Sequence, residues 1–359
     1  MKLTLKQKLE LGLVLKMSKT EQVYVIAEAG VNHNGDLQKA IELIQAAKQA
    51  GADAVKFQSF KADKLVSKTA KKAKYQSENM GDNDDTQYNM LKFLELSEED
   101  HATLIKECNK RGIQFLSTAF DVDGIEYLDS LGIPFFKSPS GEITNYPYLK
   151  RLAEKGKPVV LSTGMADMEE VKSAVQVLTE LGLDKNDITV LHCNTEYPTP
   201  MEDVNLKAMN TIGNELGVQI GYSDHTLGIE VPIAAVALGA KIIEKHFTLD
   251  RNLPGPDHRA SLEPDELKEM VAASRNIEKA ISGSGKKEPS PSEKKNKEVA
   301  RKSIHTSRSM NVGEIIKEED LIALRPGNGI SPMEWENIIG RKLNKEYSAT
   351  EILDWSSLE

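Results

Sequence analysis

The chain has 359 residues, of which 39% are hydrophobic and 28% charged, and its formal net charge at pH 7 is -9. This composition indicates a soluble globular protein with a large and a small domain, and it excludes a fibrous or disordered chain. The negative net charge gives no global field that would attract nucleic acid, and the only two cysteines, Cys108 and Cys193, exclude a disulfide scaffold and indicate a cytoplasmic protein.

Residues 1–20 are interpreted as an N-terminal extension. The apolar run in "MKLTLKQKLELGLVLKM" is broken by Lys6, Lys8, Glu10 and Lys16. No small-residue cleavage site follows, so we interpret the segment as an amphipathic or disordered extension and not as a signal peptide. The chain contains no run of 18 apolar residues, and no membrane span is expected.

Short β-type runs alternate with helical segments over residues 21–282. The eight runs are "VYVIAE", "DAVKFQS", "IQFLSTAF", "PFFKSPSGE", "PVVLSTG", "ITVLHCN", "VQIGYSDH" and "AKIIEKHF". Segments between them, such as "DLQKAIELIQAAKQAGA", have apolar residues at helical spacing. Eight such repeats predict a (β/α)8 TIM barrel. A doubly wound open sheet is the alternative, but it would not predict chemistry at the end of every strand.

Three further segments complete the predicted organisation. The connection over residues 60–97 contains "KKAKYQSENMGDNDDTQYNM" and is expected to form a lid or loop beside the site. Residues 283–298 are rich in Gly, Ser, Pro and Lys and are interpreted as a linker, whose GSGK lacks the spacing of a phosphate-binding loop. Residues 299–359 have short apolar runs and turns and predict a small β-rich domain.

Polar residues end every predicted strand, where the catalytic groups of TIM barrels lie. Side chains alternate along a strand, so polar residues two positions apart share one face and can point into the barrel mouth together. The candidates are Glu28, Lys56, Gln58, Thr118, Lys137, Ser140, Ser162, Thr163, Asn194, Ser223, His225, Glu244 and His246.

Lys56 and Lys137 end two of these strands and could hold an anion. Thr118, Ser140, Ser162 and Thr163 add hydroxyl donors, and this combination suits a phosphate together with a carboxylate. The alternative is a lysine that forms a Schiff base, which requires an apolar and desolvated setting. The segment "KSPSGE" around Lys137 is too polar to favour that alternative.

His225 and His246 end consecutive strands and could meet at the mouth. Two imidazoles with carboxylates nearby suit a divalent ion that keeps open positions. The other histidines are three weaker candidates, His33, His192 and His258, and two that are expected at the surface, His101 and His305.

Glu28, Glu142 and Asp257 are candidates for acid–base chemistry or for contacts with sugar hydroxyls or metal-bound water. Asp257 lies in "PGPDH", and the alternative there is a simple turn residue.

The motifs together resemble the sialic acid synthase family, which includes the legionaminic acid and pseudaminic acid synthases. The resemblance begins near residue 22 and continues to the C-terminal domain. It is carried by "IAEAGVNHNGD", "AVKFQSF", "FLSTAFD", "FKSPSGEITN", "LSTGMA", "EYPTP", "GYSDHTLG", "EKHFTLDRNLPGPDH" and "RPGNGIS".

This resemblance implies a metal-dependent barrel that condenses phosphoenolpyruvate with an N-acylated mannosamine-type sugar. It implies a C-terminal antifreeze-like (SAF) domain and a domain-swapped homodimer. His225 and His246 would bind the metal, Mn2+ in first place and Mg2+ or Co2+ as alternatives. By the same resemblance, phosphoenolpyruvate would be held by Lys56, Thr118, Lys137, Ser140 and Ser162. The sugar would contact Glu28, Gln58, Tyr197 and Asp257, with Glu142 close to the reacting centre and Arg325 reaching the N-acyl group from the partner subunit.

The resemblance favours an N-acetylneuraminate synthase, which joins phosphoenolpyruvate, N-acetylmannosamine and water and releases phosphate by C–O cleavage. The alternative is a legionaminic acid synthase that uses 2,4-diacetamido-2,4,6-trideoxymannose. A phosphorylated sugar is a third, less favoured candidate for the substrate. Two rival functions come from other classes: an ice-binding or purely structural C-terminal module, and a metal-dependent aldolase that uses free pyruvate.

Overall fold

The computed structural model describes residues 22–80 and 86–359, and the predicted extension over residues 1–20 lies outside them. The chain divides into two compact units, Met1–Ser282 and Gly283–Glu359. Each unit has a hydrophobic core of its own.

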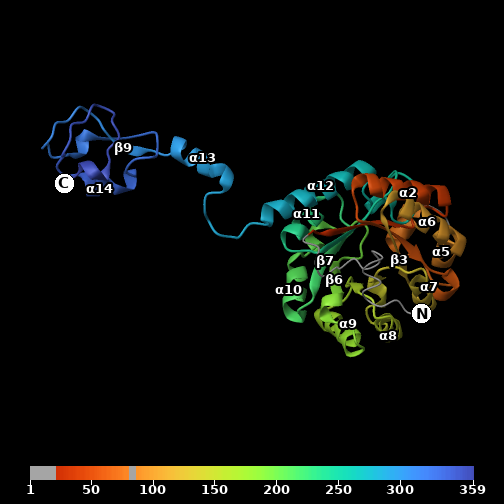
Figure 1. The fold of residues 1–359 in the computed structure, drawn as a ribbon. Helices are drawn as coiled ribbons and strands as arrows, with labels where there is room; N and C mark the ends of the chain where they lie inside the picture. The colour runs from red at the N-terminus through yellow and green to blue at the C-terminus, as the bar shows by residue number, and fades with distance from the viewer. Residues whose placement is uncertain (1–21, 81–85) are drawn as a thin grey trace. The chain divides into compact units, whose positions relative to one another are not determined.

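The first unit is built on a closed barrel of eight parallel strands, in which each strand pairs with the next and the last pairs with the first (Figure 1). The predicted (β/α)8 barrel is therefore confirmed. The strands are β1 (Tyr24–Gly30), β2 (Ala54–Ser59), β3 (Gln114–Ala119), β4 (Phe136–Ser138), β5 (Val159–Ser162), β6 (Ile188–Cys193), β7 (Gln219–Asp224) and β8 (Ile242–His246).

The helices that follow the successive strands surround the barrel (Figure 1). They are α2 (Leu37–Ala50), α6 (Glu98–Arg111), α7 (Val122–Ser130), α8 (Tyr146–Glu154), α9 (Met168–Glu180), α10 (Lys207–Leu216), α11 (Glu230–Ala237) and α12 (Pro264–Ile281). Local sequence signals fix their ends. Asp36 caps the first turn of α2, and Gly51 ends this helix at a φ of 84°, a conformation that costs glycine little. Short 3-10 turns of this unit are η1 (Ser140–Glu142), η2 (Lys185–Asp187), η3 (Met201–Asp203) and η4 (His258–Ala260).

The inside of the barrel changes character from one end to the other. Its lower layers are apolar and contain Tyr24, Ile26, Ala54, Leu116, Phe135, Val160, Leu191 and Ile242. Two residues further along the strands the inward positions become polar, as in the steps from Ile26 to Glu28 and from Ala54 to Lys56. Because side chains of a strand alternate with a period of two, the same face that packs the core also delivers the polar groups to the mouth.

β7 has a glycine, Gly221, at the point where the barrel interior is most crowded. A Cβ atom there would lie 2.4 Å from the carbonyl oxygen of Ile242 and 2.6 Å from Cδ2 of Leu191. Any larger residue would therefore push β7 away from its neighbours, and Ser223, two residues further on, would move with it.

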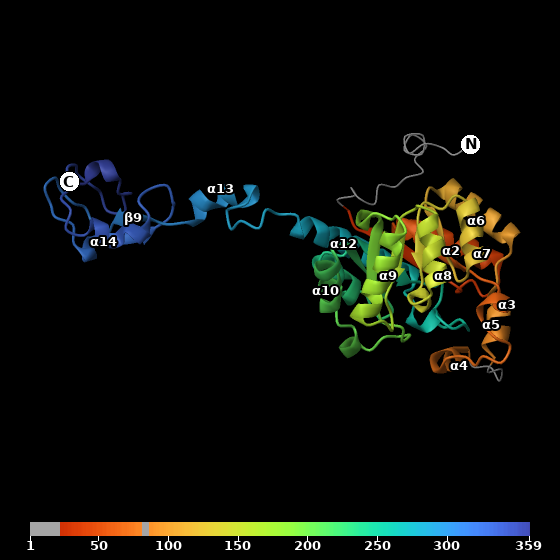
Figure 2. The same cartoon turned by 90° about the horizontal axis from the view of Figure 1, so that it is seen from below.

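The connection between β2 and β3 contains three short helices, α3 (Ala62–Leu65), α4 (Lys74–Met80) and α5 (Gln87–Leu94). They gather beyond the ring of helices at one end of the barrel (Figure 2). Their apolar side chains pack with Val31 and Phe60 into a separate cluster that includes Met90, Leu91 and Leu94. We call this segment, residues 60–97, the lid.

The second unit has a small antiparallel pair, β9 (Ser303–Thr306) with β10 (Leu321–Leu324), and a core that includes Ile304, Ile316 and Leu353. Its helices are α13 (Pro291–Ala300) and α14 (Trp335–Ile338), and its 3-10 turns are η5 (Glu318–Asp320), η6 (Pro332–Glu334) and η7 (Trp355–Ser357). The predicted small β-rich domain is confirmed.

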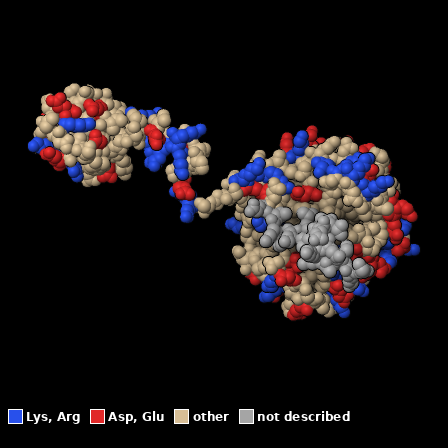
Figure 3. Space-filling model, viewed as in Figure 1, with Lys and Arg blue, Asp and Glu red and all other residues tan. Residues whose placement is uncertain are grey.

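Charged side chains of both signs are interspersed over the visible face of the first unit (Figure 3). Across residues 22–80 and 86–359, we find no helix with the length and apolar character that crossing a membrane requires.

Candidate active site

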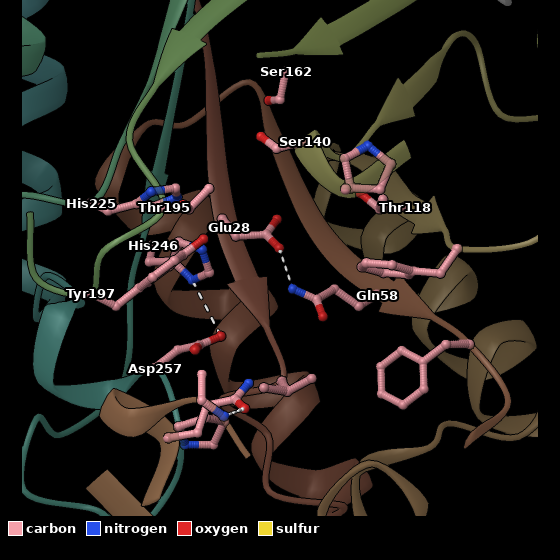
Figure 4. Close-up of a pocket in the computed structure, with 18 of the residues that line it drawn as sticks. Glu28, Gln58, Thr118, Ser140, Ser162, Thr195, Tyr197, His225, His246 and Asp257 are labelled. Atoms are coloured by element: carbon pink, nitrogen blue, oxygen red, sulfur yellow. Dashed lines mark hydrogen bonds and ion pairs between the residues drawn. The ribbon is translucent and has the colours of Figure 1, made fainter. Parts of the chain in front are cut away.

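A cavity of about 730 Å³ lies at the carboxyl ends of the barrel strands. Figure 4 shows side chains from several strands pointing into it. The predicted residues that line it are Glu28, Lys56, Gln58, Thr118, Lys137, Ser140, Ser162, Tyr197, Ser223, His225, Glu244, His246 and Asp257. The barrel thus brings together residues that are as far apart in sequence as Glu28 and Asp257.

Among the residues predicted for this site, Thr163, Asn194, Glu142 and Arg325 are not part of the cavity lining. Oγ1 of Thr163 donates to the carbonyl oxygen of Leu191, and Oδ1 of Asn194 accepts from the backbone N–H of Glu196. Glu142 belongs to the 3-10 turn after β4, and its Oε2 accepts a hydrogen bond of 2.5 Å from Nδ2 of Asn145. Arg325 lies in the second unit, where it is exposed and donates from Nε to the carbonyl oxygen of Ala300 over 2.9 Å. The structure therefore assembles the predicted site without Glu142, and Arg325 is described only within its own unit.

Two lysines and two carboxylates form a buried cluster at the centre of the mouth. Nζ of Lys56 lies 2.7 Å from Oε2 of Glu28 and 3.6 Å from Oε2 of Glu244. Nζ of Lys137 lies 3.3 Å from Oε1 of Glu244. With all four groups ionised the cluster is neutral, and it presents two ammonium groups whose positions are fixed by carboxylates.

Strand register explains why these groups meet. Glu28 is opposite Lys56 on β2 and opposite His246 on β8. Thr118 on β3 is in turn opposite Lys137 on β4. Parallel pairing therefore sets charged and polar residues of neighbouring strands at one level of the barrel.

Burial and neighbouring charges move the pKa values of the cluster in opposite directions. Burial raises the pKa of Glu28 to about 7, although Lys56 opposes this shift. Burial also acts to raise the pKa of Glu244, but Lys137 and Lys56 together lower this pKa to about 2. Glu244 is thus a firm anion, whereas Glu28 can gain or lose a proton near neutral pH, which suits a general acid or base.

Hydroxyl groups line the same region. Oγ1 of Thr118 accepts a hydrogen bond of 2.8 Å from Nζ of Lys56, and Oγ of Ser140 accepts one of 2.9 Å from the backbone N–H of Gly164. Oγ of Ser162 is buried and has no partner among the described residues. A buried hydroxyl without a partner costs free energy, so Ser162 has a vacant donor for an anionic ligand.

The opposite wall of the cavity consists of aromatic and imidazole rings. The ring centroids of His225 and His246 are 5.3 Å apart, and Tyr197 stacks on His225 at 4.0 Å. Figure 4 shows the three rings side by side. Burial lowers the pKa of His225 to about 4, and it also lowers the pKa of His246 well below its ordinary value. Both imidazoles are therefore neutral at pH 7 and offer a lone pair.

This pair of histidines fits a divalent cation. Nδ1 of His225 donates to the carbonyl oxygen of Asn194, which fixes the tautomer and leaves Nε2 as an acceptor. Nδ1 of His246 is buried without a hydrogen-bond partner among the described residues. Metal–nitrogen bonds of about 2.0–2.1 Å to each ring are compatible with the separation of the two centroids. Residues 22–80 and 86–359 hold no group of three or more His, Cys, Asp or Glu that could bind a metal, and the fit to a cation is that of the two imidazoles.

Asp257 and Gln58 add polar groups beside the imidazoles. Oδ2 of Asp257 lies 3.9 Å from Nδ1 of His246, and burial raises the pKa of Asp257 to about 7. Nε2 of Gln58 donates to Oε1 of Glu28 over 3.3 Å. These acceptors and donors suit a ligand with several hydroxyl groups.

The lid adds residues that sequence reasoning did not name. Tyr75 of α4 stacks on Tyr197 with centroids 5.2 Å apart, and so extends the row of rings that ends at the histidines. Nδ2 of Asn79 donates to the carbonyl oxygen of Pro256 over 2.6 Å, next to Asp257. α4 therefore contacts both the aromatic wall and the loop after β8. The lid prediction placed this segment near the site, but no local pattern singles out Tyr75.

Comparison with known proteins identifies the family. Residues 43–287 match the model of the NeuB family. The chain belongs to this family. Residues 301–359 match the SAF domain, as the resemblance of the second unit to antifreeze-like domains implied.

Two relatives and one solved structure cover most of this NeuB-family chain. It is 52% identical to the N,N'-diacetyllegionaminic acid synthase of Legionella pneumophila, over 94% of each chain. It is 50% identical to the enzyme of the same name from Campylobacter jejuni, over 93% of this chain and 99% of the relative. The N-acetylneuraminic acid (sialic acid) synthetase of Leptospira borgpetersenii, solved with citrate, is 37% identical over 77% of this chain and 90% of its own, with a TM-score of 0.67.

The remaining histidines of this NeuB-family protein lie outside the cavity lining. His33, His192 and His258 bond to neighbouring loops: Nδ1 of His33 accepts from the N–H of Gly35, Nε2 of His192 contacts the carbonyl oxygen of Val204, and Nε2 of His258 contacts Oδ1 of Asn34.

The surface prediction for His101 and His305 is wrong, because both are at most 3% exposed. Nε2 of His101 contacts Oγ of Ser59 at 2.7 Å, and Nδ1 of His305 contacts the carbonyl oxygen of Ser303 at 2.9 Å. Nδ1 of His101 also contacts the carbonyl oxygen of Ser97, so each histidine has at least one ring nitrogen with a partner inside the protein, which makes its burial tolerable.

Proposed function

We propose that this protein is an N,N'-diacetyllegionaminic acid synthase that condenses phosphoenolpyruvate with 2,4-diacetamido-2,4,6-trideoxymannose and water. The observation that carries the proposal is the identity of 52% and 50% to two synthases of that name over nearly the whole chain. The cavity supports it, since it combines two ammonium groups, several hydroxyls and a pair of neutral imidazoles. The N-acetylneuraminate product favoured by the sequence resemblance is less well supported, because the relative of that name is only 37% identical.

In this proposal the phosphate and carboxylate of phosphoenolpyruvate bind between Lys56 and Lys137. Both side chains are almost fully buried, and low local polarity strengthens their attraction for an anion. Thr118, Ser140 and Ser162 donate hydroxyl hydrogen bonds, of which Ser162 is ready without breaking an existing contact. The protein thereby holds the enol phosphate with its methylene carbon facing the imidazole wall.

His225 and His246 would hold a divalent cation, in first place Mn2+ with Mg2+ or Co2+ as alternatives. When bound, the cation supplies Lewis-acid polarisation of the aldehyde oxygen of the open-chain sugar. Asp257, Gln58 and Tyr197 would orient the sugar chain against the rings. Asp257 lies 3.9 Å from His246 and so reaches the reacting end of the sugar.

The reaction forms one carbon–carbon bond, from the methylene carbon of phosphoenolpyruvate to the sugar aldehyde carbon. Water adds to the phosphate-bearing carbon, and the C–O bond to phosphate then breaks, so the bridging oxygen leaves with phosphate. Glu28, whose pKa is raised to about 7, is placed to take the proton from water and to return one to the aldehyde oxygen. Lys137 keeps the phosphate in place while charge moves at the neighbouring carbon.

Steady-state phosphate release tests the proposal. The assay compares 2,4-diacetamido-2,4,6-trideoxymannose, N-acetylmannosamine and its 6-phosphate, each with phosphoenolpyruvate and with or without chelator. We expect the diacetamido sugar to have the highest kcat/KM and chelator to abolish turnover until Mn2+ is added back. A higher kcat/KM for either other sugar would refute the assignment. Replacing phosphoenolpyruvate by pyruvate tests the aldolase alternative, which predicts turnover without phosphate release.

The proposal includes a homodimer in which Arg325 of one subunit completes the site of the other. The cavity lining supports this role, because its described residues include lysines but no arginine, and Arg325 is exposed in its own unit. Mixing a Lys137→Ala chain with an Arg325→Ala chain would recover activity, since one of the two sites in the heterodimer is then intact. Absence of recovery, with heterodimers demonstrated by mass, would exclude this exchange.

A further inference from the structure

One wall of the cavity is apolar, in contrast to the charged centre and the imidazole wall. It is formed by side chains from the loop after β1, the ends of β2 and β3, and helices α3 and α5 of the lid. These residues, which we call the apolar wall, are Val31, Phe60, Leu65, Val66, Met90, Leu91, Leu94 and Phe120. They also belong to the separate hydrophobic cluster under the lid, so the wall has its own packed support.

The apolar wall has a buried layer and an open layer. Met90, Leu91 and Leu94 are at most 9% exposed and form the support. Leu65 and Val66 are only half-buried, although both line the cavity. Apolar surface that is exposed inside a cavity gains free energy when a ligand covers it. The open layer is thus a contact surface for an apolar part of the substrate.

The wall faces away from the groups that act on the reacting end of the sugar. Phe60 and Phe120 follow two residues after Gln58 and Thr118 in β2 and β3. Figure 4 shows Gln58 and Thr118 across Glu28 from His225 and Tyr197. A sugar whose aldehyde end lies at the imidazoles therefore extends its far end towards the lid.

The charges of the cavity lining argue against a phosphate group at the far end of the sugar. The cationic residues of the described lining are Lys56, Lys74 and Lys137. Lys56 and Lys137 are paired with carboxylates in the buried cluster, and Lys74 is exposed at the start of α4. A phosphate at the far end of the sugar would lose water at the apolar wall without gaining a buried cation.

We infer that the apolar wall selects the sugar by its 6-methyl group and 4-acetamido methyl group. The inference rests on the proposed function and deepens it, because it assigns the discrimination against 6-hydroxy sugars to Leu65 and Val66. One methyl group in an apolar pocket changes kcat/KM by about 10- to 200-fold. A hydroxyl in its place would lose hydration against the apolar side chains of Leu65 and Val66.

Two near-isosteric variants test the inference, Val66→Thr and Leu65→Asn. Each keeps the size of the side chain and introduces a hydrogen-bonding group on the open layer. Met80→Gln is the matched control: Met80 packs against the same cluster and is half-buried, but it does not line the cavity. The readout is the ratio of kcat/KM for 2,4-diacetamido-2,4,6-trideoxymannose to kcat/KM for N-acetylmannosamine, with thermal unfolding as a check that each variant is folded.

We expect the ratio to fall at least about fivefold in Val66→Thr and Leu65→Asn and to remain within about twofold in Met80→Gln. A smaller fall in both variants, or an equal fall in the control, overturns the inference. The wild-type ratio separately tests the proposed function: a value below one refutes the legionaminic assignment. The change between wild type and variants still tests the wall in that case, so the two failures are distinguishable.

Discussion

The buried ion pair between Asp224 and Lys245 provides a sharp test of how the barrel holds its histidines in place. Both side chains are 0% exposed, and Oδ2 of Asp224 lies 2.5 Å from Nζ of Lys245. Lys245 also donates to the carbonyl oxygen of Thr226, and Oδ1 of Asp224 accepts from the backbone N–H and the hydroxyl of Thr226. Asp224 and Lys245 directly precede His225 and His246 in the chain.

The perturbation is Asp224→Asn, which keeps the shape of the side chain but removes its charge. Lys245 then remains buried without a counter-charge, which costs roughly 3–5 kcal/mol of the free energy of unfolding. For a domain of this size about 2–4 °C of Tm corresponds to 1 kcal/mol, so Tm should fall by roughly 6–20 °C. Adding Lys245→Met removes the orphaned ammonium and should restore most of the loss, because an apolar pair of similar volume tolerates burial.

The assay is urea denaturation of wild type, Asp224→Asn, Lys245→Met and the double variant at one pH, followed by far-UV circular dichroism. The coupling free energy from this double-mutant cycle should reach at least about 2 kcal/mol. The reasoning is refuted if Asp224→Asn loses less than about 1 kcal/mol, or if the double variant is no more stable than Asp224→Asn. Either result would mean that the ammonium group of Lys245 does not need the carboxylate of Asp224 as a buried counter-charge.

Three further outcomes follow from single contacts. Ser162→Ala removes the vacant buried hydroxyl and should weaken phosphoenolpyruvate binding by roughly tenfold or more in calorimetry, since hydrogen bonds to charged groups contribute about 1.5–3 kcal/mol. Tyr75→Ala should lower kcat/KM for the sugar by about three- to tenfold through loss of stacking, whereas Tyr75→Phe retains it. In the second unit, burial acts to raise the pKa of Asp320. The backbone N–H of Lys317 and the side chain of Arg308 outweigh burial, so the pKa of Asp320 is lower than its ordinary value. The Asp320 carboxylate stabilises the unit when the pH is above the pKa that this group has in the unfolded chain. The stabilisation is lost as the pH falls through the pKa of the folded state. Wild type should therefore lose more stability than Asp320→Asn between pH 5 and 2. Tryptophan fluorescence measures this selectively, because both tryptophans belong to that unit.

Much of the site could be predicted because a barrel strand has a simple period. Once β2 is recognised, alternation alone places Lys56 and Gln58 on one face, and the same holds for Glu244 and His246 on β8. The closed topology then turns the ends of separate strands into one mouth. Glu244 illustrates the limit of this reasoning: alternation finds it at the mouth, but only the closed barrel shows that it reaches across the interior to both Lys56 and Lys137.

Contacts between distant segments could not be predicted in the same way. His101 begins a charged helix whose local pattern indicates an exposed face, yet its ring lies against Ser59 of β2 and the carbonyl oxygen of Ser97. Tyr75 lies in a polar stretch without periodicity, and its stacking on Tyr197 depends on how the lid folds back over the mouth. Both outcomes are decided by tertiary packing, which overrides local pattern.

The carboxylates of the central cluster explain how lysines can bind an anion inside a buried mouth. Burial acts to lower a lysine pKa, and a neutral amine would attract phosphate only weakly. Burial acts to lower the pKa of Lys56, but the carboxylates of Glu244 and Glu28 outweigh burial and raise this pKa. The ammonium group of Lys56 therefore stays charged. Among the residues that the structure describes, Lys137 has an ion pair with Glu244 alone, and burial lowers its pKa despite this partner. The charge of Lys137 thus depends most on a single neighbour, and in the function proposed above the phosphate of the substrate would take over the role that Glu244 has in the free protein.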